Sequence, residues 1–430
     1  MRKTLQTYEK YRDSGFQWLG KIPDHWEVKK FNYIADIVEG QVDPKEHPYQ
    51  NYILVAPNHI ESGTGRLICQ ETALDQGAIS GKYLFQSGDI IYSKIRPALR
   101  KVWKAEFPGI CSADMYPIRL SKKIIDPRYF TFLCLSESFS GFMIATSMRV
   151  AMPKVNRDDF HECHFIIPSI TEQKVIAHYL DTKTAQIDRK IDLLTQKAQR
   201  YEELKRSLIN ETVTRGLDKS VPMKDSAIEW IGEIPEHWEI FPIRTVIENR
   251  IEKNTENTED EYLSLVAGIG VIPYAEKGNV GNKKPENLEK CKMVYPGDFV
   301  LNSMNFGIGS FGISRFKGVC SSVYIVMKPK CIKSGEFLYR IFQIKPFQIY
   351  ISSFGKGIME IRMAIKWSDL KNIHIPVPPL SEQQAIARYL DTKTAQIDQI
   401  IQTINTQIEK LKELRKTLIN DVVTGKIKVA

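Results

Sequence analysis

The sequence predicts an α+β protein with two tandem domains, each a mostly antiparallel sheet with helices, and each followed by one long helix. Three observations lead to this prediction. The octapeptide Asp181-Thr-Lys-Thr-Ala-Gln-Ile-Asp188 returns unchanged as Asp391 to Asp398, apolar residues around both copies recur with helical spacing, and the stretches before them contain short β-type runs. Because an internal repeat determines the architecture, we interpret the chain as two copies of one unit.

Both copies of the octapeptide lie in long amphipathic segments. Their apolar residues are spaced by threes and fours, which is typical of a coiled-coil stripe, and mixed charges occupy the opposite faces. Leu204 and Leu414 fall within this predicted stripe. The side chains that we expect to pair the two helices are Leu180, Ile187, Ile191, Leu194, Leu208, Leu390, Ile397, Ile401, Ile404 and Leu418.

The ends of the two helices follow from their sequence signals. Thr171 and Ser381, each followed by a glutamate, are expected N-caps, and Gly216 and Gly425 are expected to end the helices. Each helix then holds roughly 45 residues and is about 65 Å long. Only about 14 residues separate Gly216 from the next domain at Trp230, too few to return along that length. We therefore expect an antiparallel coiled coil with the two domains at its opposite ends.

The domain boundaries follow from the repeat. We place domain 1 at residues 1–168, the first spacer helix at 169–217, domain 2 at 218–378 and the second spacer helix at 379–430. In domain 1, β-type runs bounded by turn residues predict strands at 51–56, 89–93, 116–120 and 164–167. A helix is expected from Pro127 to about Phe142, with Asp126 as its N-cap.

Domain 2 repeats the framework of domain 1 with different inserts. Gly88-Asp89 is answered by Gly297-Asp298, and Trp26 by Trp238, both of which we expect in the core rather than stacked on bases. Between such positions the sequences diverge, since residues 61–83 have no evident counterpart in 268–292. Two modules with a shared framework and different inserts are expected to do the same job on different targets.

Composition is that of an ordinary globular protein with a basic balance. Of 430 residues, 43% are hydrophobic and 26% are charged, and the formal net charge of +9 favours an anionic partner. The first residues lack the apolar stretch of an export signal, and no long apolar run predicts a membrane span. Seven scattered cysteines without a C-x-x-C pair suit free thiols. We expect a cytoplasmic protein that does not contact a membrane.

Catalytic and metal motifs are not convincing in this sequence. Gly307-Ile-Gly309-Ser-Phe-Gly312 matches G-x-G-x-x-G, but a strand rather than a helix is expected after it, so a glycine-rich loop is favoured over a dinucleotide site. His161-Glu-Cys163-His164 is one tight patch without distant ligands. No serine, cysteine or threonine has a histidine and an acidic residue at a spacing that would indicate a catalytic triad. We expect no catalysis, no cofactor and no metal in this chain.

Basic residues in loop segments are the remaining candidates for function. Arginine and lysine suit guanine edges and phosphates, and asparagine suits adenine. In domain 1 they accompany the aromatic residues Tyr92 and Trp103. The candidate DNA-binding residues are Lys94, Arg96, Arg100, Lys101, Lys104, Arg149, Lys154 and Arg157 in domain 1, and Lys283, Lys284, Asn302, Asn305, Arg315, Lys317, Lys356 and Arg362 in domain 2.

Over nearly its whole length the chain resembles the specificity subunit of Type I restriction-modification systems. The resemblance lies in Ile22-Pro23-Asp-His-Trp26 and Ile234-Pro235-Glu-His-Trp238, in Pro168-Ser-Ile-Thr-Glu-Gln173 and Pro379-Leu-Ser-Glu-Gln383, and in the long helix after each proline-led motif. It implies two target-recognition domains, each of which recognises one half of an asymmetric bipartite sequence in double-stranded DNA.

The resemblance also implies partners. The helices would set the spacing between half-sites and dock two methyltransferase subunits, and restriction subunits would supply the motor and nuclease. S-adenosylmethionine, ATP and magnesium would be used by those partner subunits, so the chain by itself would be non-catalytic. The family has no invariant base-contacting residue to carry over, and the candidate contacts above rest on residue chemistry alone.

Two alternative functions are open at this stage. A coiled-coil scaffold could gather proteins without recognising any DNA sequence, and an enzyme could act on DNA through an unrecognised site. Sequence-specific binding with a steep salt dependence would separate the first alternative from DNA recognition. Cleavage or methylation of DNA by the isolated chain would support the second.

Overall fold

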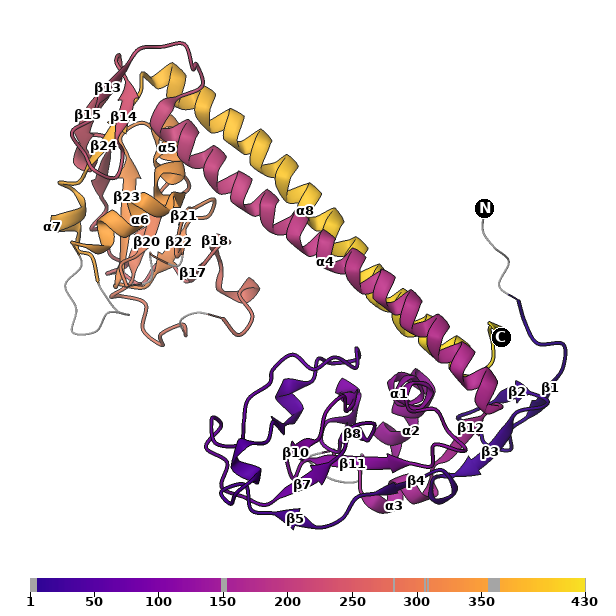
Figure 1. Ribbon diagram of the computed structural model, residues 1–430. Coiled ribbons are helices and arrows are strands. Elements are labelled where there is room, and N and C mark those ends of the chain that lie inside the picture. The colour runs from indigo at the N-terminus through magenta and orange to yellow at the C-terminus, as the bar shows by residue number, and fades with distance from the viewer. Residues whose placement is uncertain are drawn as a thin grey trace. The chain divides into compact units, whose positions relative to one another are not determined.

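The computed structural model describes residues 6–147, 153–280, 283–304, 307, 309–354 and 364–429. The chain divides into two compact units, Met1–Thr195 with Asn405–Ala430 (unit 1) and Gln196–Ile404 (unit 2). Each unit therefore contains one of the two domains together with half of each long helix. The α+β class with two sheet-containing domains and two long helices is confirmed (Figure 1).

The two long helices are α4, Ile170–Arg215 with 46 residues, and α8, Leu380–Val423 with 44 residues. Gly216 and Gly425 follow them with φ of 74° and 77°, the left-handed conformation that commonly ends a helix, as predicted. The predicted N-caps were wrong. Thr171 lies inside the first turn of α4, and the hydroxyl of Ser169 accepts from the Glu172 amide at 3.3 Å.

In each unit the halves of α4 and α8 run antiparallel. In unit 1, Asp188 pairs with Arg415 (Nε to Oδ1, 3.0 Å), while Leu180 shares a core with Val423. From Leu180 to Asp188 the residue numbers rise along α4, while those of their partners fall from Val423 to Arg415 along α8. In unit 2 the same holds for Lys205 with Asp398, at 2.6 Å, and for the core that Ile209 and Val213 share with Ile386 and Leu390. The antiparallel pairing is therefore confirmed within each unit.

The repeated octapeptide is explained by its contacts. Its last residue, Asp188 or Asp398, forms the ion pair across the two helices described above. Its first residue, Asp181, meets Arg128 of the neighbouring domain at 3.3 Å, and Asp391 meets Arg340 in the same way. Each copy therefore joins the two long helices to each other and to the domain of its own unit.

The side chains expected to pair the helices lie at covered positions. Leu180, Leu390, Ile397 and Ile404 are buried, and Ile187, Ile191, Leu194, Leu208, Ile401 and Leu418 are half-buried.

Leu204 and Leu414 were placed in this stripe wrongly. They are 52% and 54% exposed, whereas the neighbouring Lys205 is half-buried and Arg415 is buried. The stripe passes through 205 and 415 because their long stems are covered while their cationic ends find an aspartate on the other helix.

Domain 1 contains two four-stranded sheets and two strand pairs. The first sheet has the order β4 (Ala35–Ile37), β11 (Met115–Leu120), β8 (Ile90–Ser93) and β9 (Val102–Lys104). The second has the order β5 (Gln41–Val42), β7 (Lys82–Phe85), β10 (Gly109–Cys111) and β6 (Leu54–Val55). The pairs are β1 (Tyr11–Asp13) with β2 (Lys21–Pro23), and β3 (Glu27–Lys30) with β12 (His164–Ile167).

Domain 2 repeats the first of these sheets in the same order, β16 (Ile247–Asn249), β23 (Tyr324–Pro329), β20 (Phe299–Asn302) and β21 (Phe311–Ile313). The remaining strands form pairs: β13 (Met223–Asp225) with β14 (Glu233–Pro235), β15 (Glu239–Pro242) with β24 (His374–Val377), β17 (Leu263–Val266) with β18 (Gly270–Pro273), and β19 (Lys292–Val294) with β22 (Gly318–Cys320). Among the described residues, β6 with β10 is the one parallel pair of named strands, and all others are antiparallel. The prediction of mostly antiparallel sheets is confirmed.

The helices of domain 1 differ from the prediction in one respect. Asp126 caps the first of them, since its Oδ1 accepts from the amides of Arg128 and Tyr129. The single helix expected to about Phe142 is two helices, α1 (Pro127–Leu135) and α2 (Glu137–Ser147), because Ser136 is extended and its hydroxyl accepts from the Phe139 amide. α3 (Arg157–Glu162) follows.

The same interruption occurs in domain 2. There α5 (Ile332–Gln343) and α6 (Lys345–Ser352) are separated at Ile344, and α7 (Trp367–Leu370) precedes β24. The break between two short helices therefore belongs to the shared framework of the two domains.

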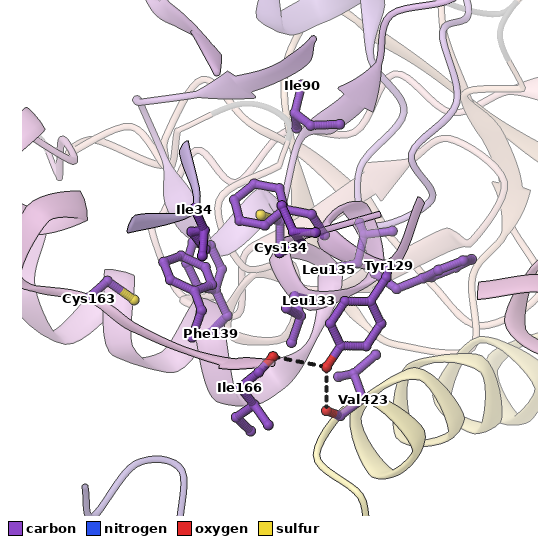
Figure 2. Close-up of a cluster of buried hydrophobic side chains, with 14 of the residues drawn as sticks. Ile34, Ile90, Tyr129, Leu133, Cys134, Leu135, Phe139, Cys163, Ile166 and Val423 are labelled. Carbon is purple, nitrogen blue, oxygen red and sulfur yellow. Dashed lines mark hydrogen bonds between the residues drawn. The ribbon is translucent and has the colours of Figure 1, made fainter. Parts of the chain in front are cut away.

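The core of unit 1 joins its domain to both long helices. Figure 2 shows Tyr129 of α1 among buried side chains, with its hydroxyl donating to the carbonyl oxygens of Ile166 (3.1 Å) and Val423 (3.4 Å). Ile176 and Leu180 of α4 and Ile419 of α8 are buried in the same cluster. The helix ends are thus part of the domain core.

The two repeated tryptophans are core residues, as expected. Trp26 donates to Glu172 Oε1 at 3.1 Å, and His25 lies 3.2 Å from the other carboxylate oxygen. In unit 2, His237 lies 2.8 Å from Glu382, and Trp238 is fully buried. The Ile-Pro-x-His-Trp motif therefore attaches the start of each domain to the first turn of its long helix.

The repeated Gly-Asp pair is structural as well. Asp89 is buried and accepts two hydrogen bonds from Arg119, at 3.1 and 2.7 Å. Asp298 accepts two from Arg250, at 2.7 and 3.0 Å, although Arg250 directly follows β16 whereas Arg119 lies in β11. Bidentate pairing satisfies a carboxylate that would be costly to bury alone.

The end of α8 tests the close packing of unit 1. A Cβ at Gly425 would fall on the ring of Pro23 and 3.1 Å from Trp26, at a φ that L residues rarely adopt. We expect Gly425→Ala to destabilise the protein by at least about 1–2 kcal/mol from the backbone alone. Differential scanning calorimetry should show a lower transition temperature.

Gly141 provides a matched control, because it lies inside α2 and nothing lies within 4 Å of the Cβ it would gain. Gly141→Ala should raise stability by about 0.5–1 kcal/mol. Equal transition temperatures for Gly425→Ala and the unsubstituted protein would contradict the packing described.

Candidate nucleic-acid interface

The loop between β8 and β9 in domain 1 gathers the basic candidates into one place. The backbone of Ile95 pairs with Lys154, and the amide of Val155 donates to the Lys94 carbonyl at 2.7 Å. Two segments that are separate in the sequence therefore lie side by side. We call the surface formed by Lys94, Arg96, Lys154 and Arg157 the basic loop surface.

The basic loop surface concentrates positive charge around one aromatic ring. Lys94 Nζ and the Arg157 guanidinium lie 5.3 and 5.9 Å from the centre of the Tyr116 ring. Partial burial lowers the pKa of Lys94, and repulsion from Lys154 and Arg157 lowers it further. An anion placed here would relieve that repulsion, so the surface suits a phosphate or a base edge.

Backbone strain occurs in the same loop. Arg96 and Arg100 have φ of 50° and 47°, and they flank the short 3-10 helix Pro97–Leu99. A non-glycine residue in this conformation costs about 1–2 kcal/mol. Such strain is often found at functional sites, where it fixes the direction of a side chain. Arg96 is exposed, and its side chain has no partner among the residues that the structure describes.

Two other candidates of domain 1 are engaged elsewhere, and a third lines a cavity. Arg100 donates to the Leu135 carbonyl at 3.3 Å, at the end of α1. Lys101 donates to the Pro57 carbonyl. Lys104 lies at the far end of β9, in a cavity of 270 Å³ that Arg128 and Asp181 also line. Arg100 and Lys101 support the fold around the loop, and Arg157 pairs with Glu39 at 2.5 Å, whereas Arg96 and Lys154 are the ones left open.

The aromatic residues expected beside the basic cluster were assigned wrongly. Tyr92 and Trp103 are 2% and 4% exposed, because β8 and most of β9 are buried. Tyr116 takes the expected position beneath the cations instead. A continuous apolar run such as Ile90-Ile91-Tyr92 is a signal for a strand buried on both faces.

Arg415 is a residue that sequence reasoning missed. Its guanidinium donates to the carbonyl oxygens of Gly63 (2.6 Å) and Thr64 (3.0 Å), and Nε lies 3.0 Å from Asp188. The Gly63 amide in turn donates to the Arg100 carbonyl at 3.3 Å. Burial lowers the pKa of Arg415, while Asp188 opposes that effect. The spacing of the helical stripe passes through position 415 and could have identified it.

These contacts surround a cleft of 710 Å³ within unit 1. Its lining includes Arg66, Arg100, Lys101 and Lys412 together with Asp188 and Glu409. Charges of both signs line it, so the cleft lacks the single-sign field that would favour one charged ligand.

In domain 2 the candidates are dispersed. Asn302 is 4% exposed and accepts from the Met304 amide, so its side chain is used by its own turn. Lys284 donates to the Asp260 carbonyl at 3.1 Å, and Lys317 pairs with Glu259 at 3.1 Å, which raises the pKa of Lys317. Arg315 is exposed beside a 510 Å³ cavity, and Lys283 is exposed in the insert.

Four candidates lie outside the described residues, namely Arg149, Asn305, Lys356 and Arg362.

The glycine-rich stretch of domain 2 leads into a strand rather than a helix, as expected, because its last residue, Gly312, lies in β21. β21 pairs antiparallel with β20. A Cβ at Gly312 would lie 2.8 Å from the Gly270 Cα, so this glycine allows β21 to approach β18 closely. Within the described part of the chain, no helix combines the length and apolarity needed to cross a membrane.

Comparison with known proteins gives a consistent family. The family model described as "Type I restriction modification DNA specificity domain" matches twice, at residues 23–203 and 235–410. The specificity subunit of the Type I restriction enzyme EcoDI from Escherichia coli is 39% identical over 188 residues, which is 41% of this chain and 41% of that one. The putative MjaX specificity subunit of Methanocaldococcus jannaschii is 25% identical over 444 residues, covering 97% and 98%.

Solved structures share the fold. A chain of a type I R-M system superposes with a TM-score of 0.71 at 18% identity, covering 94% of this chain and 98% of that one. The HsdS subunit of Thermoanaerobacter tengcongensis superposes with a TM-score of 0.51 at 19% identity and the same coverage. With both of its halves matched by one family model, the chain belongs to the Type I restriction-modification DNA specificity family.

Proposed function

We propose that this chain is the DNA sequence-recognition subunit of a Type I restriction-modification complex. The observation that carries the proposal is the duplicated framework, in which each domain is attached through an arginine and a repeated aspartate to a pair of long helices. The family match in both halves supports it. Each domain would recognise one half of a bipartite target in double-stranded DNA.

The target would be asymmetric because the two domains differ where contact is expected. In domain 1 the loop of β8 and β9 carries Arg96 at one of its two strained backbone positions, whereas the corresponding loop of β20 and β21 in domain 2 contains Gly309 with φ of 83° and no arginine. Different side chains on one framework would recognise different bases.

The long helices would act as a spacer between the half-sites. A continuous helix of 46 residues is about 69 Å long, and pairing with a second helix stiffens it. The ion pairs of Asp188 and Asp398 would hold the two helices in one register. The separation of the half-sites in DNA would follow from that register.

The helices would also dock two methyltransferase subunits. Leu204 and Leu414 occupy equivalent positions in the two repeats, and about half of each side chain is exposed. One lies in unit 2 and the other in unit 1. Equivalent apolar positions in a duplicated chain suit two copies of one partner, as in a two-fold assembly.

Catalysis would belong to the partners. Methyltransferase subunits would use S-adenosylmethionine, and restriction subunits would use ATP and magnesium for translocation and cleavage, while this chain contributes no catalytic group. The complex would act in the cytoplasm, where it would meet the DNA that it binds. No specific observation favours the scaffold alternative. It would also leave the basic loop surface without a function.

Quantitative DNA binding tests the proposal. With its methyltransferase partner, the chain should bind one bipartite sequence at least about a thousandfold more tightly than random duplex, with affinity falling steeply as salt increases. Fluorescence anisotropy across a salt series measures both quantities. A flat salt dependence without a preferred sequence would leave the scaffold function in place.

Arg96 tests which domain contacts which half-site. Arg96→Ala should weaken recognition of one half-site by about 1–3 kcal/mol, because a bidentate contact to a base would be lost. Competition with duplexes altered in either half measures the effect, and the other half-site serves as the internal control. Arg315→Ala should affect the opposite half only. Equal weakening at both halves would show that Arg96 contacts neither base set.

The docking surface is tested by single substitutions in the two repeats. Leu204→Ser or Leu414→Ser should each remove one methyltransferase subunit, since apolar burial at one of two equivalent sites is lost. Mass photometry of the complex should then show one bound subunit instead of two. Ile251→Ser, at an apolar residue of domain 2 that is 76% exposed, is the matched control. Full occupancy in both leucine variants would exclude these positions as the docking surface.

A further inference from the structure

Three potential metal ligands lie close together in the segment between β6 and β7 of domain 1, residues 56–81, which we call the insert. They are not part of the basic loop surface. His59 ends the short 3-10 helix Pro57–His59, and Cys69 and Glu71 lie on the segment that returns toward β7. One ligand atom from each of the three residues lies within 4.8 Å of the other two. Neither His161 nor His164 belongs to this group, which is the one found among the described residues.

The backbone brings these ligands together. The outgoing and returning segments pair at Ile53 with Thr72 and at Ile60 with Leu67. Between these two bridges the Leu54 amide donates to the Glu71 carbonyl at 2.9 Å, and the Ile68 amide donates to the His59 carbonyl at 2.8 Å. Cys69 and Glu71 are two residues apart, which places extended side chains on the same face. That face is directed toward His59.

The orientation of His59 suits a metal ligand. Its Nδ1 lies 3.0 Å from the Leu54 carbonyl oxygen and 3.3 Å from the Ala56 amide nitrogen, and the side chain is 4% exposed. The carbonyl oxygen can only accept a hydrogen bond and is the nearer of the two, so it favours the tautomer with the hydrogen on Nδ1. When Nδ1 donates its hydrogen to a carbonyl, Nε2 carries the free lone pair, which is the common arrangement of histidines bound to zinc. Within the described residues, Nε2 has no hydrogen-bond partner.

We propose that His59, Cys69 and Glu71 bind one zinc ion, with water as the fourth ligand. Imidazole, thiolate and carboxylate are the three side-chain groups that zinc takes in tetrahedral sites. Tetrahedral bond lengths place neighbouring ligand atoms about 3.3–3.8 Å apart, so donors that lie within 4.8 Å of one another need to approach by at most about 1.5 Å. Glu71 is exposed and Cys69 is half-buried, which leaves both side chains room to move.

The ion would link the two ends of the insert that supports the basic loop surface. The Pro57 carbonyl accepts from Lys101, and the Gly63 amide donates to the Arg100 carbonyl, so the outgoing segment of the insert and the turn after it contact the loop of β8 and β9. In domain 2 the hairpin of β17 and β18 occupies the corresponding position. Zinc would thus stabilise domain 1 where a regular hairpin serves domain 2.

Cobalt(II) titration of the full chain, freed of metal by dialysis against a chelator, tests the site. One equivalent should bind and produce the near-ultraviolet charge-transfer band of a thiolate ligand. Cys69→Ser should abolish that band and weaken binding at least about tenfold. Glu71→Gln should weaken binding and keep the band. Zinc should displace the cobalt, and hydrogen exchange of residues 53–72 should slow when zinc is bound.

Cys331→Ser is the matched control, because Cys331 is the other half-buried cysteine. It should leave the stoichiometry, the band and the affinity unchanged. A band that survives in Cys69→Ser, or cobalt uptake that is the same in Cys69→Ser and the unsubstituted chain, would overturn the assignment. Neither readout depends on DNA binding, so failure here leaves the proposed function intact.

Discussion

The ion pair between the last aspartate of the repeated octapeptide and a cation of the opposite helix is the constraint on which the rest depends. It occurs twice, as Asp188 with Arg415 and as Lys205 with Asp398. An apolar stripe alone allows two helices to slide by a heptad, whereas a charge pair at one position is satisfied in one register. With that register fixed, Asp181 and Asp391 meet Arg128 and Arg340, so each domain acquires a defined attachment to its helices.

The two copies of the ion pair are not used alike. Among the described residues, Asp398 is the one partner of the Lys205 ammonium, whereas the guanidinium of Arg415 also donates to the Gly63 and Thr64 carbonyls of the insert. In unit 1 one side chain therefore connects α4, α8 and the segment next to the basic loop surface. Domain 1 combines this connection with strained arginines, while in domain 2 β20 and β21 pair antiparallel and a glycine, Gly309, takes the positive φ.

Much of this architecture could be predicted because it follows from the spacing of apolar residues along the chain. The stripe, the two closing glycines and the short connection after Gly216 were sufficient for two antiparallel helices. Prediction failed where a side chain serves a tertiary contact. Leu414 is more hydrophobic than Arg415, yet the arginine is buried because it pairs with Asp188 and donates hydrogen bonds to two backbone carbonyls. The burial of Trp103 and Asn302 likewise depends on neighbours that are distant in sequence.

The attachment of the domains has an evolutionary consequence. Each one meets its helix through an arginine on its first helix after the sheet, and the acceptor aspartate belongs to the repeated octapeptide rather than to the segments in which the two domains differ. A foreign module would need an arginine at the position of Arg128 and core side chains that fit the buried ends of both helices, such as Ile176 and Ile419. Recombination between genes within the octapeptide coding region would then create new pairings of DNA targets in a single event.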